Sequence, residues 1–397
     1  MKVCFVVESI FSFGGVQRVT AVIARHLSLG NVACGIPPCE VTIVTFDPPS
    51  SFDTTFYGLD EAPGIDYRFF SYPQVGGLKK RLCKAYSYLY RRVLPQKPFT
   101  SWLYSHSSFP SELRRKLAGE LNSKPYDAII GVHAPIATRL AALCDALQCK
   151  NLIGWVHNSF EAMFSYGSWY AGPELERYFV WQLHRLSHTV VLCHCDVAPY
   201  KEKYGFEPQV IYNPLTLKPG TPSTGRSKRF LAVGRFSHQH KGFDLLIQAF
   251  ALFAKKDKEW SLDIVGEGPE ENLYWQLISK YNLEGRVRLH PFTNNIQDYY
   301  SQVQVYVLSS RWEGFGLVLV EAMAHGLPVV SSDLPTSLEI MGGFGLYFSN
   351  GNVEELALRL HEATKLDWPV KSAEAFNIAR RFDADAITTQ WLSLMKK

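Results

Sequence analysis

Two glutamates, Glu313 and Glu321, flank the point where a glycine-containing turn leads into a predicted helix. A strand-like apolar run over residues 303–310 ends at this turn, and an apolar helical pattern follows from about Phe315 to Gly326. The helix start offers free N–H groups and a positive dipole end, which favour a phosphate. Two carboxylates there would bind hydroxyl groups on either side of that phosphate. A solvated glutamate pair on an ordinary helix is the alternative, and the position directly after a buried strand favours the site.

A second loop carries the cations that such a phosphate needs. Arg235 and Lys241 follow a predicted strand over residues 230–234. Arginine can bind a diphosphate as a fork and lysine as a point charge. Either residue alone would be interpreted as a solvated surface charge. Together with the two glutamates, which also lie at strand ends, they predict a site for a diphosphate-linked ligand.

The first half of the chain supplies further candidates at the ends of predicted strands. Gly14 and Gly15 lie between the first strand and the first helix, where they allow the backbone to approach a phosphate or a sugar. They do not form a G-x-G-x-x-G pattern, which argues against a nicotinamide dinucleotide site, and they could also form a plain tight turn. His133 and His157 each follow a predicted strand, where a histidine can bind a sugar hydroxyl, take a proton or be structural.

Short strands that are apolar on both faces alternate with helices and predict an α/β fold with doubly wound parallel sheets. A polar stretch over residues 218–228 predicts a flexible linker between two halves. We expect ligands to bind in a cleft at the carboxyl ends of the strands. The predicted strands cover residues 2–7, 40–46, 127–132, 151–156, 189–193 and 209–212 in the first half, and residues 230–234, 261–265, 287–290, 303–310 and 328–332 in the second.

Length and composition, at 397 residues with 47% hydrophobic and 20% charged residues, are those of a soluble globular protein with two domains. The chain contains no run of about 18 apolar residues, so we expect no membrane-spanning helix. The first apolar run meets Glu8 too early for a signal peptide. The eight cysteines form no C-x-x-C pair and are interpreted as reduced thiols of a cytosolic protein, so no metal site is expected.

The net charge is only +4, but the positive charge is concentrated in one region. Residues 67–124 contain 12 Lys and Arg and only two acidic residues, and part of this excess lies on a segment with Leu and Tyr at helical spacing. Such a segment can lie on an anionic membrane surface. It could instead bind nucleic acid, although no recognisable module accompanies it, or be a surface helix with a basic face. The basic residues of the segment are Lys79, Lys80, Arg81, Lys84, Arg91 and Arg92.

Four motifs together resemble the retaining glycosyltransferases of family 4. The motifs are FGGVQRV at residues 13–19, GRFSHQHKGFD at 234–244, VGEGP at 265–269 and EGFGLVLVEA at 313–322. Their order and spacing cover nearly the whole chain. The resemblance implies the GT-B fold, in which two Rossmann-like doubly wound domains face a central cleft. Residues 1–215 would form the acceptor-binding domain and residues 216–380 the nucleotide-sugar-binding domain, with a last helix over 381–397 packing back on the first domain.

The resemblance also assigns roles to the charged candidates. Arg235 and Lys241 would hold the diphosphate of a nucleotide sugar, most often a UDP-sugar. Glu321 would bind the ribose hydroxyls, and Glu313 would bind the transferred sugar. The family retains the anomeric configuration without a metal or other cofactor, so the protein would contribute charge stabilisation and positioning.

Backbone groups would complete the donor site. By the resemblance, the main chain at Phe315, Gly316 and Leu317 would contact the phosphate and the sugar. Gly14 and Gly15 would close over the donor from the first domain. These positions predict close approach of the backbone to the ligand rather than side-chain chemistry.

Both histidines match forms found in the family, and both are expected to line the site without a ranking between them. His133 stands in a His-x-Pro form seen in some mannosyltransferases, and His157 in a form seen in many polysaccharide and glycolipid transferases. The acceptor would be a glycan or a polyprenyl-linked molecule, used at the cytoplasmic face of an anionic membrane. The alternatives are a GDP-mannose-dependent mannosyltransferase, a GT-B epimerase or phosphorylase, and a membrane- or nucleic-acid-binding protein with a vestigial sugar site; no nucleic-acid partner is expected.

Overall fold

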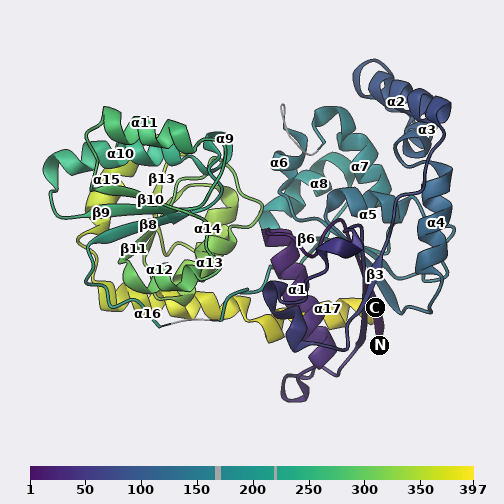
Figure 1. Ribbon diagram of the computed structural model, residues 1–397, viewed down its shortest axis with the longest axis horizontal. Coiled ribbons are helices and arrows are strands. Elements are labelled where there is room, and N and C mark those ends of the chain that lie inside the picture. The colour runs from purple at the N-terminus through teal and green to yellow at the C-terminus, as the bar shows by residue number, and fades with distance from the viewer. Residues whose placement is uncertain (166–170, 219–220) are drawn as a thin grey trace. The chain divides into compact units, whose positions relative to one another are not determined.

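The computed structural model describes residues 1–165, 171–218 and 221–397. Contacts divide the chain into two compact units. The N-terminal unit consists of Met1–Pro214 together with Ala384–Lys397, and the C-terminal unit consists of Leu215–Asp383. The chain therefore passes between the units twice (Figure 1).

The N-terminal unit is built on a parallel sheet, in which the described strands follow the order β3-β2-β1-β4-β5-β6-β7. The first six strands of this series have the doubly wound order of a Rossmann fold. Most residues of the central strands are buried on both faces, which explains their continuous apolar sequence. The strands are β1 (Lys2–Val7), β2 (Glu40–Thr45), β3 (Asp66–Phe69), β4 (Ala128–Val132), β5 (Leu152–Trp155), β6 (His188–Val191) and β7 (Gln209–Val210).

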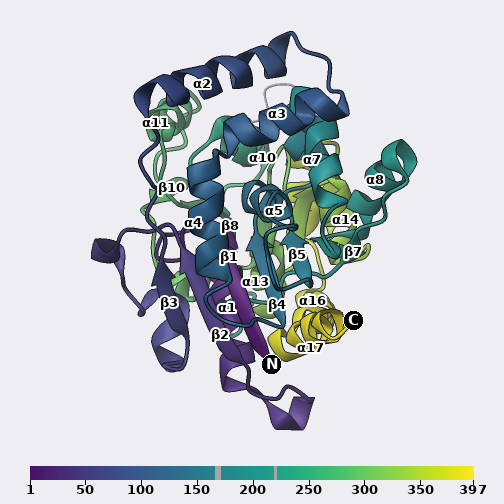
Figure 2. The same ribbon diagram turned by 90° about the vertical axis from the view of Figure 1, so that its right-hand side faces the viewer.

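Helices pack around this sheet and enclose an apolar core to which β1, β4, α4, α5 and α7 contribute (Figure 2). Among the described residues, these helices are α1 (Gly15–Leu29), α2 (Gly77–Arg92), α3 (Pro98–Ser108), α4 (Ser111–Leu121), α5 (Ala134–Ala141), α6 (Phe160–Phe164), α7 (Glu176–Leu183), α8 (Val197–Tyr204) and α17 (Ala384–Met395).

The C-terminal unit repeats the same winding with the strand order β10-β9-β8-β11-β12-β13, again all parallel. Helices α10 and α11 lie on one side of this sheet and α12 and α13 on the other (Figure 1). The strands are β8 (Arg229–Val233), β9 (Ser261–Val265), β10 (Val287–His290), β11 (Val305–Leu308), β12 (Val329–Ser332) and β13 (Leu346–Phe348). The helices are α9 (His238–Lys241), α10 (Phe243–Lys256), α11 (Glu271–Lys280), α12 (Ile296–Gln302), α13 (Leu317–Ala324), α14 (Pro335–Met341), α15 (Val353–Ala363) and α16 (Trp368–Ala379).

The predicted α/β class with two doubly wound parallel sheets is confirmed, but one edge strand of each sheet was missed. The sequence patterns did not predict the edge strands β3 and β13, and the strand expected over 303–310 is shortened to β11. Strand β3 has the sequence Asp-Tyr-Arg-Phe and is only half-buried. Arg68 within it donates to Asp66 and Glu120. An edge strand stabilised by polar pairs lacks the apolar run that marks a central strand.

The linker expected over residues 218–228 is wrong for its described part from residue 221 onward. Ser223 is buried, its backbone N–H donates to the His325 carbonyl at 3.2 Å, and its hydroxyl donates to the carbonyl of Val303. Gly225 lies against the ring of Trp368. Small polar residues in this segment make buried hydrogen bonds within the C-terminal unit. Amino-acid composition alone does not distinguish such a segment from a solvated linker.

The last helix, α17, belongs to the N-terminal unit. Asp385 at its start accepts hydrogen bonds from His26 Nδ1 and Asn31 Nδ2, both at 2.7 Å. Further along, Trp391 is fully buried and its ring meets that of Trp155 edge to face at 4.6 Å between centroids. The final residues of the chain are therefore part of the N-terminal core.

No helix in the described ranges is long and apolar enough to cross a lipid bilayer.

Candidate functional site

The strand order of the C-terminal unit reverses between β8 and β11, which lie side by side. The loop after β8 carries Arg235 and Lys241, and the loop after β11 carries Glu313. Ligands of doubly wound folds bind outside the carboxyl ends of the strands at such a reversal. The fold thus brings three of the predicted residues to the expected edge of the sheet.

Lys241 and Glu313 form a closely packed ion pair at this edge. Lys241 Nζ lies 2.6 Å from Glu313 Oε1, and both side chains are almost withdrawn from solvent, with 13% and 8% exposed. The hydroxyl of Ser310 donates to the same carboxylate oxygen at 2.6 Å. Burial alone would raise the pKa of Glu313, but the charge of Lys241 and the His240 ring outweigh it and hold that pKa well below its usual value. Glu313 is therefore an anion at neutral pH.

Backbone contacts hold the two loops together. The Arg311 N–H donates to the His240 carbonyl at 2.8 Å, and the Ser309 hydroxyl donates to the Lys241 carbonyl at 2.9 Å. Gly242 makes this approach possible, because its φ is +63° and an added Cβ would lie 2.2 Å from the Ser309 carbonyl oxygen. The position of the Lys241 ammonium is thus set by the close packing of two strand-end loops.

Two further contacts beside the ion pair were not anticipated from the sequence. The rings of His240 and Trp312 are stacked with 3.7 Å between centroids, and His240 Nε2 lies 3.8 Å from Glu313 Oε2. Arg311 forms a two-pronged pair with Asp244, with N···O distances of 3.0 and 2.8 Å. His240 and Trp312 directly precede Lys241 and Glu313 in the sequence, and Asp244 lies at the start of α10. This proximity to predicted site residues was the only sequence signal that could have identified them.

Arg235 is placed differently from Lys241. Its side chain is exposed, whereas its neighbour Phe236 is buried and packs against the turn at Gly266–Gly268. The Phe236 N–H donates to the Glu267 carbonyl at 2.7 Å, and a Cβ on Gly268 would meet the Phe236 carbonyl oxygen at 2.5 Å. Of the two predicted cations, Lys241 is therefore held in position by an ion pair, whereas Arg235 lies on the surface.

The helix that carries Glu321 begins at Leu317, two residues later than the sequence pattern indicated. Gly316 precedes it in the left-handed conformation with φ +83°. Phe315 is buried against Phe382 with 5.8 Å between ring centroids. The first backbone N–H groups of a helix have no partner inside it, so the main chain from Leu317 onward is suited to bind an anion.

Glu321 is buried inside the C-terminal unit rather than on a wetted helix face. Its Oε1 accepts from the Thr216 hydroxyl at 3.2 Å and its Oε2 from the Tyr300 hydroxyl at 3.1 Å. Glu321 and Glu313 therefore have separate surroundings, one of hydroxyl groups and one of cationic and polar groups.

In the N-terminal unit, Gly14 and Gly15 lie on an exposed turn after β1, and Gly15 is the first residue of α1. The Gly14 N–H donates to the Tyr57 hydroxyl at 2.9 Å, and this hydroxyl also contacts the Ser12 carbonyl at 3.2 Å. The turn is thus held by a tyrosine from a distant loop. Its glycines remain accessible for a close backbone contact.

His133 and His157 follow β4 and β5, and the structure places them near each other. The Asn158 amide nitrogen donates to His133 Nε2 at 3.0 Å, which puts the proton of a neutral His133 ring on Nδ1. Burial lowers the pKa of His133 to about 4, and burial together with His133 lowers that of His157 well below its usual value. Both rings are therefore neutral at pH 7, and Asn158 is a third candidate that the sequence did not single out.

The six basic residues predicted to meet a membrane all lie on α2, but they are not equivalent. Lys79 is paired with Glu112 at 2.6 Å, and Arg91 with Glu174 at 2.7 Å. Arg92 lies over the Tyr88 ring. The other three, Lys80, Arg81 and Lys84, are exposed.

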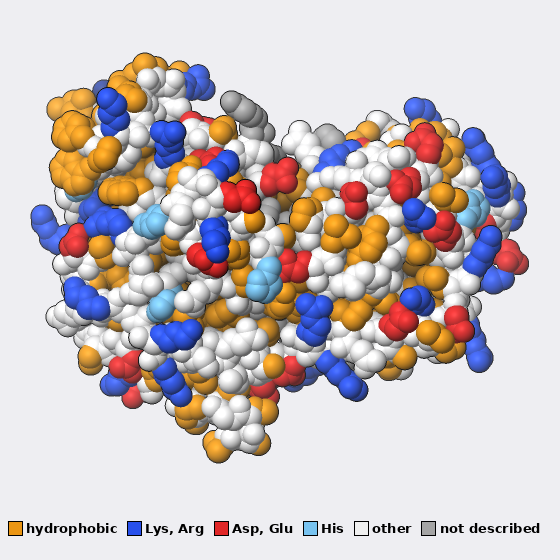
Figure 3. Space-filling view, turned by 180° about the vertical axis from the view of Figure 1, so that it is seen from behind, with side chains coloured by type: hydrophobic (Ala, Val, Ile, Leu, Met, Phe, Trp, Pro, Cys, Tyr) orange, Lys and Arg blue, Asp and Glu red, His pale blue; other side chains and the backbone are white. Residues whose placement is uncertain are grey.

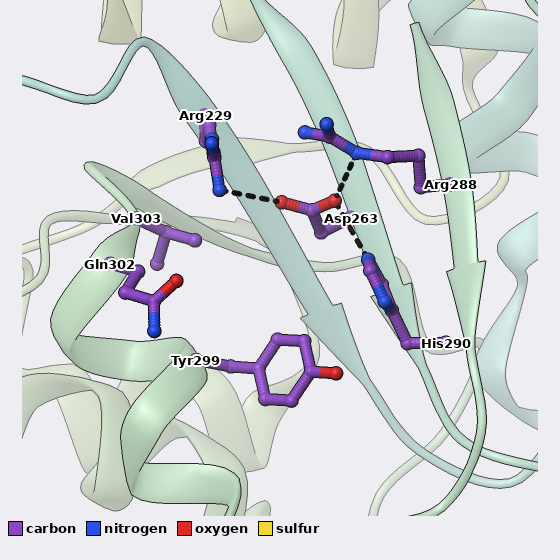
Figure 4. A pocket seen from close by; sticks show the side chains of 7 residues that line it. All are labelled: Arg229, Asp263, Arg288, His290, Tyr299, Gln302 and Val303. Atoms are coloured by element: carbon purple, nitrogen blue, oxygen red, sulfur yellow. Dashed lines mark hydrogen bonds and ion pairs between the residues drawn. The ribbon is translucent and has the colours of Figure 1, made fainter. Parts of the chain in front are cut away.

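A cavity of about 310 Å³ lies on the sheet of the C-terminal unit beside α12, and its lining includes none of the predicted residues (Figure 4). Asp263 on β9 is buried there and accepts from Arg288 Nε at 2.8 Å and from His290 Nε2 at 2.9 Å. Arg229 approaches the other carboxylate oxygen at 4.0 Å. These contacts largely compensate the buried charge, so we interpret the cluster as structural.

Comparisons with known proteins bear on the family and the fold of the chain. The family described as "Glycosyl transferases group 1" matches residues 216–381, which is nearly all of the C-terminal unit. An uncharacterized glycosyltransferase of Haemophilus influenzae is 29% identical over 268 residues, covering 64% of this chain and 73% of that protein. A poly(ribitol-phosphate) alpha-N-acetylglucosaminyltransferase of Staphylococcus aureus is 24% identical over 55% of this chain, but over only 46% of its own length.

The crystal structure of Anabaena HepE in complex with UDP superimposes on the whole chain, with a TM-score of 0.75, 20% identity and full coverage of both chains. This likeness confirms the predicted GT-B fold. Residues 216–381 thus match the group 1 glycosyl transferases, and these findings support the predicted resemblance of the chain to a family 4-like glycosyltransferase.

Proposed function

We propose that this protein transfers a hexose or an N-acetylhexosamine from a nucleotide sugar, first of all a UDP-sugar, to a glycan or polyprenyl-linked acceptor in surface polysaccharide or glycolipid biosynthesis. The ion pair of Lys241 and Glu313 at the strand-order reversal carries this proposal. The N-acetylglucosamine that the Staphylococcus aureus relative transfers and the UDP bound by HepE support the choice of donor.

Lys241 is suited to the diphosphate of the donor. Its ammonium has three N–H donors, and the bond to Glu313 Oε1 occupies one of them. The remaining donors, the start of α13 and the exposed Arg235 would compensate the negative charge that develops as the diphosphate departs. This arrangement performs without a metal what a bound cation would otherwise do.

Glu313 is suited to the sugar. Its Oε1 is occupied by Lys241 and Ser310, whereas the nearest partner of Oε2 among the described residues is the more distant His240 ring at 3.8 Å. Oε2 can accept a hydrogen bond from a sugar hydroxyl. Because Glu313 stays ionised at neutral pH, that bond is charge-assisted and about twice as strong as a neutral one.

The transfer would retain the anomeric configuration. The acceptor oxygen forms a bond to the anomeric carbon on the face from which the diphosphate leaves, the bond from that carbon to the diphosphate oxygen breaks, and this oxygen takes the acceptor proton. We assign His133 and His157, as neutral rings, to hydrogen bonds with sugar or acceptor hydroxyls. The Gly14–Gly15 turn would contact the donor through its backbone.

Release of nucleoside diphosphate tests this function. UDP-glucose, UDP-galactose, UDP-N-acetylglucosamine and GDP-mannose are each incubated with the protein, with and without a membrane extract that supplies acceptors. We expect release with a UDP-sugar, and a loss of about 100-fold or more when Lys241→Ala or Glu321→Ala removes a group that binds the donor.

Lys255→Ala, which changes an exposed lysine at the end of α10, is the matched control and should leave release unchanged. Release that depends on GDP-mannose alone would replace the UDP donor by the mannosyl alternative. Absence of release with every donor and acceptor preparation would contradict the proposal. The anomeric proton coupling of the isolated product distinguishes retention from inversion.

A further inference from the structure

Helices α2 and α3, with the connection between them, form a hairpin whose cations lie on α2 and on the connection. Residues 77–108 contain seven Lys and Arg and no Asp or Glu. The hairpin is attached to the rest of the N-terminal unit by ion pairs at its edges, from Lys79 to Glu112 and from Arg91 to Glu174. Its remaining positive charges face solvent.

The inner face of the hairpin is well packed. Tyr90 is buried and its ring stacks on that of Tyr104 with 4.4 Å between centroids. The Tyr90 hydroxyl lies 2.7 Å from the Ser101 hydroxyl, and the Tyr86 hydroxyl donates to the Thr100 carbonyl at 3.0 Å. The two helices therefore have a defined orientation. Loose packing of the hairpin does not explain why the side chains on the opposite face are exposed.

That outer face is rich in large apolar side chains. Leu78, Leu82 and Leu89 follow helical spacing along α2 and are 74%, 63% and 46% exposed. On α3, Phe99 and Trp102 are 69% and 49% exposed and lie with their rings nearly parallel. Figure 3 shows the resulting hydrophobic surface over α2 and α3 at the upper left, with Lys and Arg side chains beside it.

We propose that this hairpin docks on an anionic lipid bilayer, with its leucines and aromatic rings in the headgroup region and its cations on the lipid phosphates. An amphipathic helix with a basic polar face binds an interface in this way, and Trp is favoured at the headgroup level. Of the six residues predicted for this role, Lys80, Arg81, Lys84 and Arg92 present their charge, joined by Lys97, whereas Lys79 and Arg91 hold the hairpin in place.

Charge and shape favour a bilayer over other occupants. A nucleic acid would meet the cations but offers nothing to an exposed stripe of leucines. A second copy of the hairpin would bring two surfaces together that both lack acidic residues, so like charges would repel. A bilayer with anionic headgroups satisfies the charges and the apolar side chains together. This docking is independent of the sugar-transfer reaction.

Vesicle flotation tests the proposal with the full-length protein. Vesicles of phosphatidylcholine, with or without phosphatidylglycerol, are mixed with wild type, with Lys80→Ser/Arg81→Ser/Lys84→Ser, and with Leu82→Ser/Phe99→Ser/Trp102→Ser. We expect binding to vesicles that contain phosphatidylglycerol, weakened about 100-fold by the charge variant, since each basic residue near the surface contributes about fivefold. The apolar variant should lose at least about tenfold, and added salt should weaken binding of wild type more than that of the charge variant.

The matched control is Leu358→Ser/Val370→Ser/Trp275→Ser, which removes equally exposed apolar side chains from the C-terminal unit and should bind as wild type. Circular dichroism melting establishes that each variant is folded. Equal flotation of wild type and both hairpin variants would overturn the proposal. So would a dimer in sedimentation velocity that the apolar variant converts to a monomer, or binding of single-stranded RNA tighter than that of the anionic vesicles.

Discussion

Lys241 and Glu313 illustrate how a functional charge pair constrains a fold. Both side chains are nearly buried, so the desolvation of each charge is offset mainly by the other charge, with Ser310 and the His240 ring also contacting the carboxylate. Such pairs seldom stabilise a protein relative to apolar residues, but removing one partner leaves a buried charge uncompensated. We therefore interpret the pair as serving donor binding at a cost in stability.

A double-variant cycle tests this interpretation. Lys241→Met should lower the free energy of unfolding by about 3–5 kcal/mol, because Glu313 is left buried and charged. The double variant Lys241→Met/Glu313→Gln should recover much of that loss while releasing no UDP from a UDP-sugar. Urea unfolding of the two single variants and the double variant gives the coupling energy, and additive effects of the two changes would contradict it.

The pH dependence of the cycle has a definite sign. The pKa of Glu313 is lower in the folded protein than in the unfolded chain, where it is about 4.3. The stability that its ionised form contributes is therefore present above that pH and is lost as the pH falls toward the folded pKa. The difference between wild type and Glu313→Gln should be constant above about pH 5 and should shrink in acid.

At the scale of elements, the site depends on two strand-end loops that must approach closely. The loop from Gly234 to Gly242 and the loop from Ser309 to Gly316 are joined by backbone hydrogen bonds. At a reversal of strand order, the chain leaves two neighbouring strands toward opposite sides. The loops that follow these strands therefore leave a crevice between them. Gly242 sets the distance between these loops.

Gly242→Ala should lower stability and activity together. Alanine at φ +63° is strained by about 1 kcal/mol, and its Cβ would also collide with the Ser309 carbonyl oxygen. We expect a total cost of about 2–4 kcal/mol and a loss of donor hydrolysis, because Lys241 moves with the loop. Gly351→Ala is the control: its φ is +86° but an added Cβ meets nothing within 4 Å. Equal effects of the two changes in thermal unfolding would show that the loop contact is unimportant.

At the scale of the whole molecule, the N-terminal unit is completed by residues from the other end of the chain. Helix α17 lies along α1 and buries Trp391 against Trp155. Because α17 follows the C-terminal unit in the sequence, the N-terminal unit cannot form its full core until the C-terminal unit has been synthesised.

Trp391→Ala should destabilise the N-terminal unit in particular. Removing a fully buried indole leaves a cavity and costs about 3–5 kcal/mol. Hydrogen exchange should therefore accelerate in peptides from β1, β4 and β5, while peptides from β8 and β11 keep their rates. Trp275→Ala, which removes a half-exposed ring from α11, should change neither set by more than about 1 kcal/mol. Uniform acceleration in both units would contradict this assignment.

The sequence by itself determined the architecture and predicted the place of the candidate site. Central parallel strands are buried on both faces, so their apolar runs mark them clearly, and the residues after each run fall at one edge of a sheet. That reasoning located Lys241, Glu313, His133 and His157. It failed at the edge strand β3, where polar pairing replaces the apolar run, and at the edge strand β13, which is only three residues long. It also failed at Ser223, which lies in a segment of linker-like composition but makes buried hydrogen bonds.

Only the tertiary structure decided which of the predicted residues act together. Whether a loop side chain meets solvent or a partner depends on what other strand ends bring near it, and that is a long-range property. Lys241 forms a nearly buried ion pair with Glu313, whereas Arg235, in the same motif, is exposed. Likewise Lys79 is tied to Glu112 while Lys80, the next residue, faces water, because successive residues of a helix point in different directions.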